Sequence, residues 1–71
     1  MEIELEDAIE HLTAKNRMKI QDIWKKLGLD RSSFQSWRRS SIPTRRAELC
    51  EEIIKAFPDE FTEDKIEKIK Q

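Results

Sequence analysis

The chain has 71 residues, of which 41% are charged and 37% are hydrophobic, with a net charge of -1 at pH 7. This length allows one domain with a small core. No apolar run approaches the roughly 20 residues that cross a bilayer, and the acidic start is unlike a signal peptide. The sequence therefore predicts a cytoplasmic protein that has no membrane partner.

The first two elements are predicted as helices. Apolar residues near the N-terminus repeat at three- and four-residue spacing, at Leu5, Ala8, Ile9 and Leu12. We expect that helix to end near Asn16. A second helix of about two turns is predicted over 20–27. Gly28, the only glycine, follows it directly and is expected to cap it in the left-handed conformation.

A third helix is predicted after Asp30, whose side chain can accept from the free amides of the first turn. Phe34 and Trp37 share one face of this helix and are expected to reach the core. The opposite face is polar and carries no acid; its centre is formed by Ser32, Gln35, Ser36 and Arg39. Ile42-Pro43 should end this helix.

Two more helices complete the prediction. Thr44 is expected to cap the fourth, whose apolar positions are Ala47, Cys50, Ile53, Ile54 and Phe57. After a turn at Pro58-Asp59, Thr62 is expected to cap a last short helix, with Phe61 and Ile66 as a hydrophobic staple. The predicted fold is one all-α domain over 1–71, a bundle of about five short helices.

Positive charge is concentrated in the middle of the chain. Residues 17–46 contain nine basic and two acidic residues, whereas 1–16 contain five acids and one base and 47–71 contain eight acids and four bases. This pattern indicates a cationic face for a polyanion, although charge runs are more often ordinary solvated surface. Arg45 and Arg46 favour the first interpretation, because the first turn of a helix disfavours cations unless an anion binds there.

Two helices joined through a glycine turn, over about 19–40, form a helix-turn-helix pattern. At this point the sequence resembles the DNA-binding domains of phage repressors of the Cro and lambda-repressor type. The resemblance covers about 18–57 and is carried by Ile23, Leu27-Gly28-Leu29, Ser33-Phe34, Trp37-Arg38-Arg39 and Ile42-Pro43. Trp24 departs from the family, which usually has a small residue there. Either the two helices cross further apart, or Trp24 swings aside.

The resemblance implies which residues meet DNA. Those expected at base edges are Arg31, Ser32, Gln35 and Ser36, and Arg, Gln and Ser have suitable donors and acceptors for bases. Those expected at phosphates are Lys19, Lys25, Arg39, Ser40, Ser41, Thr44, Arg45 and Arg46. Lys26 could instead pair with Asp22, and Arg38 could pack beside Trp37 or bind a phosphate.

The predicted function is that of a sequence-specific double-stranded DNA-binding regulator, bacterial or phage-encoded, without cofactor or small-molecule ligand. His11 and Cys50 lack a partner set for catalysis or metal binding, so no enzyme is predicted. We expect a homodimer that uses 58–71, with apolar candidates Phe57, Phe61, Ile66 and Ile69, unless these residues only close the monomer core. The alternatives are a protein-protein adaptor and the DNA-binding part of a larger repressor or antitoxin.

Overall fold

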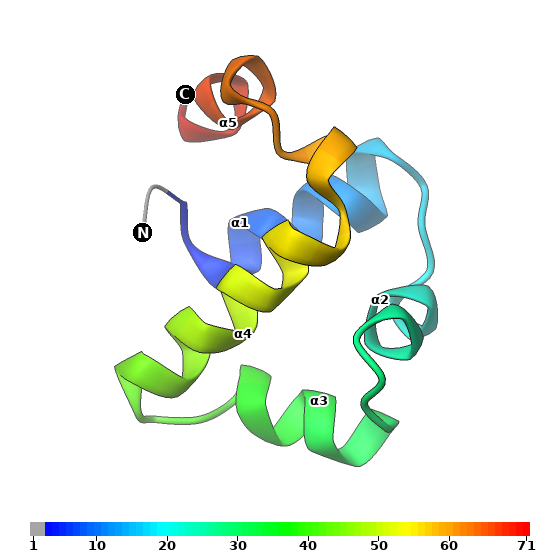
Figure 1. The fold of residues 1–71 in the computed structure, drawn as a ribbon. Coiled ribbons are helices and arrows are strands. Elements are labelled where there is room, and N and C mark those ends of the chain that lie inside the picture. The colour runs from blue at the N-terminus through cyan, green and yellow to red at the C-terminus, as the bar shows by residue number, and fades with distance from the viewer. Residues whose placement is uncertain (1–2) are drawn as a thin grey trace.

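The structure of the protein, a computed structural model, describes residues 3–71 (Figure 1). Helices make up most of this part of the chain, and no strand occurs in it. The elements in order are α1 Leu5–Glu10, a π-helical segment His11–Lys15, α2 Ile20–Lys26, α3 Arg31–Arg38, α4 Pro43–Ala56, a 3-10 turn Pro58–Glu60 and α5 Glu63–Lys70. The predicted fold class, an all-α bundle of five short helices, is confirmed.

The core lies where the first four helices meet. Its largest completely buried side chains come from four elements: Leu12 from the π-helical segment, Ile23 from α2, Phe34 from α3, and Leu49 and Ile53 from α4. The longest helix, α4, packs against both α1 and α3 and runs between them in Figure 1. Burying one such aliphatic or aromatic side chain stabilises the fold by about 1.5–3 kcal/mol. The same core therefore fixes the orientation of every helix from α1 to α4.

The first helix buries the predicted face and then continues as a π-helix. Leu5, Ala8, Ile9 and Leu12 are all buried. From His11 onward the turns are π-helical, and the chain leaves the helix at Asn16, as predicted. The backbone N–H of Asn16 donates to the His11 carbonyl oxygen at 3.2 Å, and its side-chain Nδ2 donates to the same oxygen at 2.9 Å.

The fourth helix begins earlier than the sequence predicted. Ile42 is the N-cap and Pro43 occupies the first helical position, so the prediction that Thr44 caps α4 was wrong. Proline is favoured at that position because its fixed φ suits the helix and its missing N–H would have had no partner. The Ile42 carbonyl accepts from the backbone N–H groups of Arg45 and Arg46 at 3.2 and 3.4 Å.

The C-terminal segment closes the same core. Thr62 caps α5, as predicted, because its Oγ1 accepts from the backbone N–H of Lys65 at 3.4 Å. Phe61 is only 6% exposed, while Phe57, Ile66 and Ile69 are partly buried against the core. Phe61 therefore lies in the monomer interior, which favours the alternative that it closes the monomer core. The other three side chains also use much of their apolar surface within the monomer.

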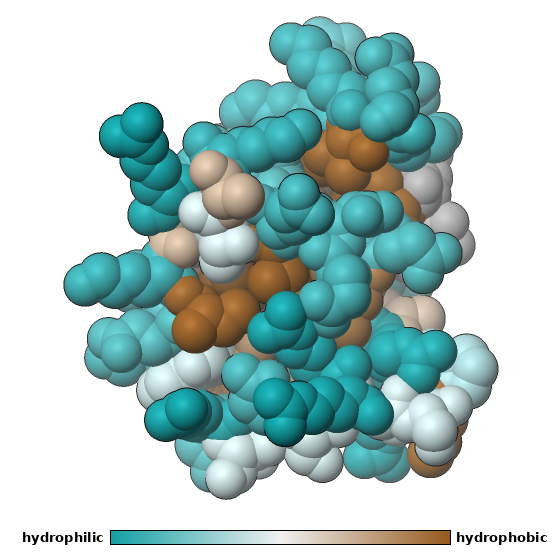
Figure 2. Space-filling view, turned by 180° about the vertical axis from the view of Figure 1, so that it is seen from behind, coloured by the Kyte–Doolittle hydropathy of each residue, from teal (hydrophilic) through white to brown (hydrophobic). Residues whose placement is uncertain are grey.

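The surface is mostly hydrophilic. Figure 2 shows one face of the molecule, on which apolar residues appear as separate areas between hydrophilic side chains. Among residues 3–71, Ile42 is the one large hydrophobic residue that is clearly exposed, at 50%. In the same range, no helix has the length and apolar character required to cross a membrane.

Candidate nucleic-acid interface

The outer side of α3 brings together the four side chains predicted to contact bases and one predicted to contact a phosphate. The base candidates Arg31, Ser32, Gln35 and Ser36 line one open hollow of about 770 Å³ together with the phosphate candidate Arg39. Four of these side chains are exposed and Gln35 is half-buried. No acidic side chain lines the hollow. The result is a surface of hydrogen-bond donors and acceptors with net positive charge.

The aromatic side chains on the inner side of α3 determine which side of the helix faces solvent. Phe34 is completely buried and Trp37 is partly buried against the core, as the helical spacing predicted. Asp30 caps the helix, since its Oδ1 accepts from the backbone N–H of Ser33 at 2.7 Å. That hydrogen bond lowers the pKa of the Asp30 carboxyl. With the aromatic side anchored inward, Arg31, Ser32 and Ser36 face solvent, and Gln35 lies between them, half-buried.

The turn between α2 and α3 depends on Gly28, which has φ +75°. Two hydrogen bonds close the turn: Gly28 N–H donates to the Lys25 carbonyl and Leu29 N–H donates to the Trp24 carbonyl, both at 3.0 Å. This pair of bonds is the Schellman motif, which satisfies the last carbonyl groups of a helix. Trp24 itself is partly buried against the core, where the family resemblance would place a small side chain.

The predicted phosphate contacts divide into free and occupied groups. The exposed ones are Lys19, Lys25, Arg39, Ser41, Thr44 and Arg45. Ser40 and Arg46 are partly buried and already used: Ser40 Oγ accepts from Ile42 N–H at 3.1 Å, and Arg46 Nη1 donates to the Ser40 carbonyl. These two residues hold the connection between α3 and α4, so a phosphate could be bound only by the donors that these bonds leave free, the Ser40 hydroxyl and the other Arg46 N–H groups.

Only one of the nine basic residues in 17–46 forms an ion pair within the described chain. Arg38 donates to Glu6 from Nε at 2.9 Å and from Nη2 at 2.8 Å. This bidentate pair lowers the pKa of Glu6 and raises that of Arg38. From the sequence, Arg38 was expected either to pack its side chain beside Trp37 or to bind a phosphate. No sequence pattern indicated a partner 32 residues away. Lys26 is not paired with Asp22, which instead accepts from the Lys19 N–H at 3.3 Å.

Arg45 has an aromatic neighbour. Its guanidinium carbon lies 5.8 Å from the centre of the Trp37 ring, a cation–π distance. Exposed Ile42 lines the same surface, together with Thr44 and Glu48. The sequence patterns did not indicate this surface, because Ile42 was interpreted only as part of the Ile-Pro pair that ends a helix.

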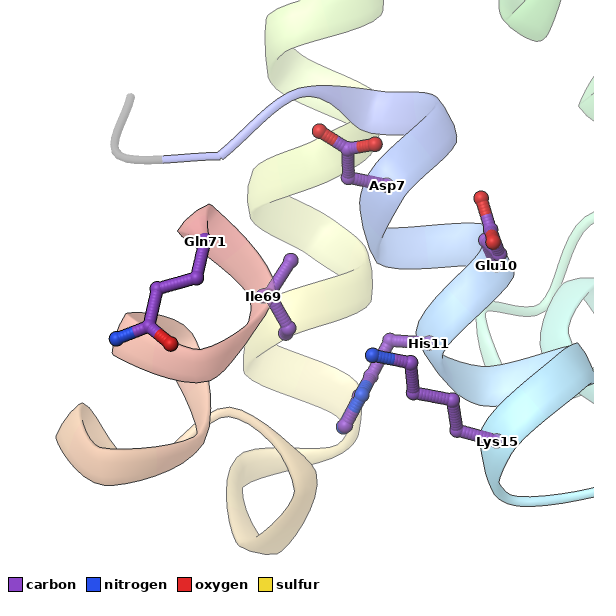
Figure 3. A pocket seen from close by; sticks show the side chains of 6 residues that line it. All are labelled: Asp7, Glu10, His11, Lys15, Ile69 and Gln71. Atoms are coloured by element: carbon purple, nitrogen blue, oxygen red, sulfur yellow. The ribbon is translucent and has the colours of Figure 1, made fainter.

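A second, smaller hollow lies between the first helical segment and the C-terminus (Figure 3). It measures about 210 Å³ and is lined by Asp7, Glu10, His11, Lys15, Ile69 and Gln71. His11 Nε2 lies 2.9 Å from the Glu60 carbonyl oxygen, and its ring lies 5.4 Å from that of Phe61. Across residues 3–71, no group of three or more potential ligands could hold a metal ion. His11 thus helps to dock the segment that leads to α5.

Comparison with protein-family models, with curated proteins and with solved structures finds no match for this chain.

Proposed function

We propose that this protein is a sequence-specific double-stranded DNA-binding regulator of transcription that places α3 in the major groove. The observation that carries the proposal is the outer side of α3, where Arg31, Gln35 and Arg39 lie with two serines around one open, acid-free hollow. An α-helix fits the major groove of B-DNA, which is about 12 Å wide. Bidentate bonds from Arg to guanine or from Gln to adenine each discriminate by about 1–3 kcal/mol.

Cations on the flanking helices suit the phosphates on either side of such a groove. Lys19 and Lys25 belong to the α2 region, Arg45 belongs to α4, and these helices adjoin the two ends of α3 (Figure 1). All three side chains are exposed, and none forms an ion pair with a described carboxylate. Contacts of this kind position a protein on DNA without reading its sequence.

A salt titration tests the proposal. If each subunit neutralises about five phosphates, log affinity for a duplex should fall against log salt with a slope of about -4 to -5 per subunit. Fluorescence anisotropy with a labelled duplex measures this slope. Retention of DNA that is negligible even at low salt would reject the proposal and favour a protein-protein adaptor.

Selection of bound duplexes from a random pool tests sequence specificity. One unit of this size reads only four or five base pairs, so a regulator would be expected to bind as a dimer. Two recognition helices related by a twofold axis would enrich a near-palindrome with half-sites roughly 34 Å apart. An enriched site without symmetry would contradict the dimer, and a pool without enrichment would contradict specific reading.

A further inference from the structure

Arg45 has two candidate partners beside it, and its side chain lies against only one of them. Glu48 is one turn farther along α4, a spacing at which opposite charges on a helix can pair. No ion pair joins these two side chains in the described part of the chain. The guanidinium carbon of Arg45 instead lies over the ring of Trp37, 5.8 Å from its centre. Arg45 and Glu48 are both exposed, so an external ligand can reach either charge.

The contact with Trp37 leaves the charge of Arg45 available. An aromatic ring attracts a cation through the negative potential of its face and does not neutralise it. An ion pair with Glu48 would cancel the charge and occupy N–H donors of the guanidinium. The ring therefore keeps Arg45 cationic and able to donate to an anion from outside the chain.

Trp37 is itself fixed relative to the outer side of α3. It belongs to this helix and is partly buried against the core. Phe34, one turn earlier on the same side, is completely buried. The packing that orients the outer side of α3 thus also holds the ring, and a cation over the ring keeps a defined place beside the helix.

We infer that Trp37 is a positioning residue, whose ring holds Arg45 away from Glu48 and in place for a DNA phosphate beside the groove that α3 occupies. The inference rests on the proposed function and adds to it a residue that touches neither a base nor a phosphate. Immobilising one flexible side chain on binding lowers affinity by about two- to tenfold. Trp37 removes this cost by ordering Arg45 before DNA binds.

A measurement without DNA tests the arrangement. In NMR spectra of the full chain, the ring current of Trp37 should shift the side-chain protons of Arg45 upfield. Trp37→Leu should abolish this shift while it keeps an apolar anchor on α3, and circular dichroism checks that the helices remain. Arg31, exposed at the start of α3, is the control and should not change. Arg45 signals that do not depend on Trp37 would overturn the inference.

A double-mutant cycle measures the role of Trp37 in binding. Trp37→Leu should weaken binding to every duplex by about two- to tenfold and keep the preference among duplexes within about twofold. In an Arg45→Ala background the same change should alter affinity by less than about twofold, because the side chain that Trp37 positions is gone.

Trp24→Leu, which removes the other tryptophan, is the matched control for this cycle. Its effect on affinity should be the same with and without Arg45. If Trp37→Leu also costs the same in both backgrounds, or lowers the preference among bases, its role is structural and the inference is wrong.

Glu48→Gln tests the competing partner. With Trp37 present, this change should raise affinity by no more than about twofold, since Arg45 is already held away from the carboxylate. With Trp37→Leu the gain should be larger, because Arg45 is then released from a pair with Glu48. Glu52→Gln, at an exposed position one turn farther along α4, should give the same small gain in both backgrounds. A gain from Glu48→Gln that is independent of Trp37 would refute the competition.

Failure of this inference can be told from failure of the proposed function. A wild type that retains no duplex at low salt would reject the regulator, and with it the role of Trp37. A wild type that binds DNA with the expected salt slope, while Trp37→Leu and Arg45→Ala act independently, would reject only the role of Trp37.

Discussion

Glu6 and Arg38 form the one ion pair that joins α1 to α3 among residues 3–71. The Arg38 side chain is 28% exposed and that of Glu6 is 62% exposed, so solvent screens the pair. Its geometry is nonetheless bidentate, which is the favourable arrangement for Arg and a carboxylate. The pair uses one cation of the basic segment and connects the end of α3 to the N-terminal helix α1.

Glu6→Gln should reduce stability at pH values above the unfolded pKa of Glu6 and not in strong acid. The pKa of Glu6 is lowered in the folded state, so its contribution is present above the unfolded pKa and is lost as pH falls through the folded pKa. We expect a loss of about 0.2–1 kcal/mol at pH 7, the usual range for an exposed pair. Urea unfolding should show this difference at pH 7 and no difference near the acid limit. Glu10→Gln, also in α1 but without a described ion-pair partner, is the control; an equal loss in both variants would contradict the assignment.

At the scale of single helices, start signals explain most boundaries. Thr62 caps α5 by accepting from Lys65 N–H, whereas Thr44 lies inside α4 behind Ile42 and Pro43. The same residue type therefore has two different roles in one chain. Replacing each threonine by alanine measures the difference between the two roles.

Thr62→Ala should destabilise the protein by about 1 kcal/mol, because a capping hydrogen bond is lost. Thr44→Ala should change stability by no more than about 0.5 kcal/mol, since no cap is removed and the side chain is exposed. Thermal unfolding of both variants gives the comparison. Equal losses would mean that Thr44 has a stabilising contact that its position in α4 does not account for.

The two sides of the proposed interface should respond differently to mutation. Gln35→Ala removes a donor-acceptor pair from the outer side of α3, and should weaken preference at one base step by about 1–3 kcal/mol. Arg45→Ala should weaken binding to all duplexes alike and reduce the salt slope by about one. Competition between a selected site and its single-base variants measures the split. If both variants lose affinity equally on every duplex, the assigned roles are wrong.

Local rules predicted the parts of the fold that depend on neighbouring residues. Apolar spacing placed the buried face of α1. The caps at Asp30 and Thr62 and the turn at Gly28 follow from backbone hydrogen bonds that span at most five residues. The sequence also grouped the outer residues of α3 correctly, because helical geometry alone puts them on one side. At Ile42-Pro43-Thr44, two start signals overlap, and the proline signal prevails.

Those rules could not predict contacts between segments that are distant in the sequence. The Arg38–Glu6 pair and the His11–Glu60 contact join residues 32 and 49 positions apart, and only the packed bundle brings them together. The π-helical segment was likewise unpredicted, since apolar spacing does not distinguish it from a regular α-helix. Arg46 and Ser40 were both predicted to contact phosphates, and the sequence patterns did not indicate that Arg46 donates to the Ser40 carbonyl.

For the molecule as a whole, one core serves every helix from α1 to α4. Cys50 lies within it at 1% exposure, and its Sγ is 3.8 Å from the Ile3 carbonyl oxygen. Burial raises the pKa of this thiol to about 11. The reactive thiolate is therefore scarce at neutral pH, and a reagent reaches it only when the core opens.

Thiol labelling should consequently report global unfolding. At pH 8 the native protein should react with a disulfide reagent far more slowly than the urea-unfolded chain, and the rate should rise with urea in parallel with the unfolded fraction. Cys50 is the only cysteine, so the signal has one source. Native-state labelling as fast as that of the unfolded chain would show that this part of the core opens locally.

The last helix is attached to the bundle less firmly than the others, because α5 contains no fully buried residue. Its amide protons should exchange with solvent sooner than those of α4, and a protease should trim it before cutting elsewhere. Replacement or extension of this helix would disturb folding less than a change in any of the preceding four. The C-terminal end is accordingly the place where a tag, or a second domain, can be added with least cost to the bundle.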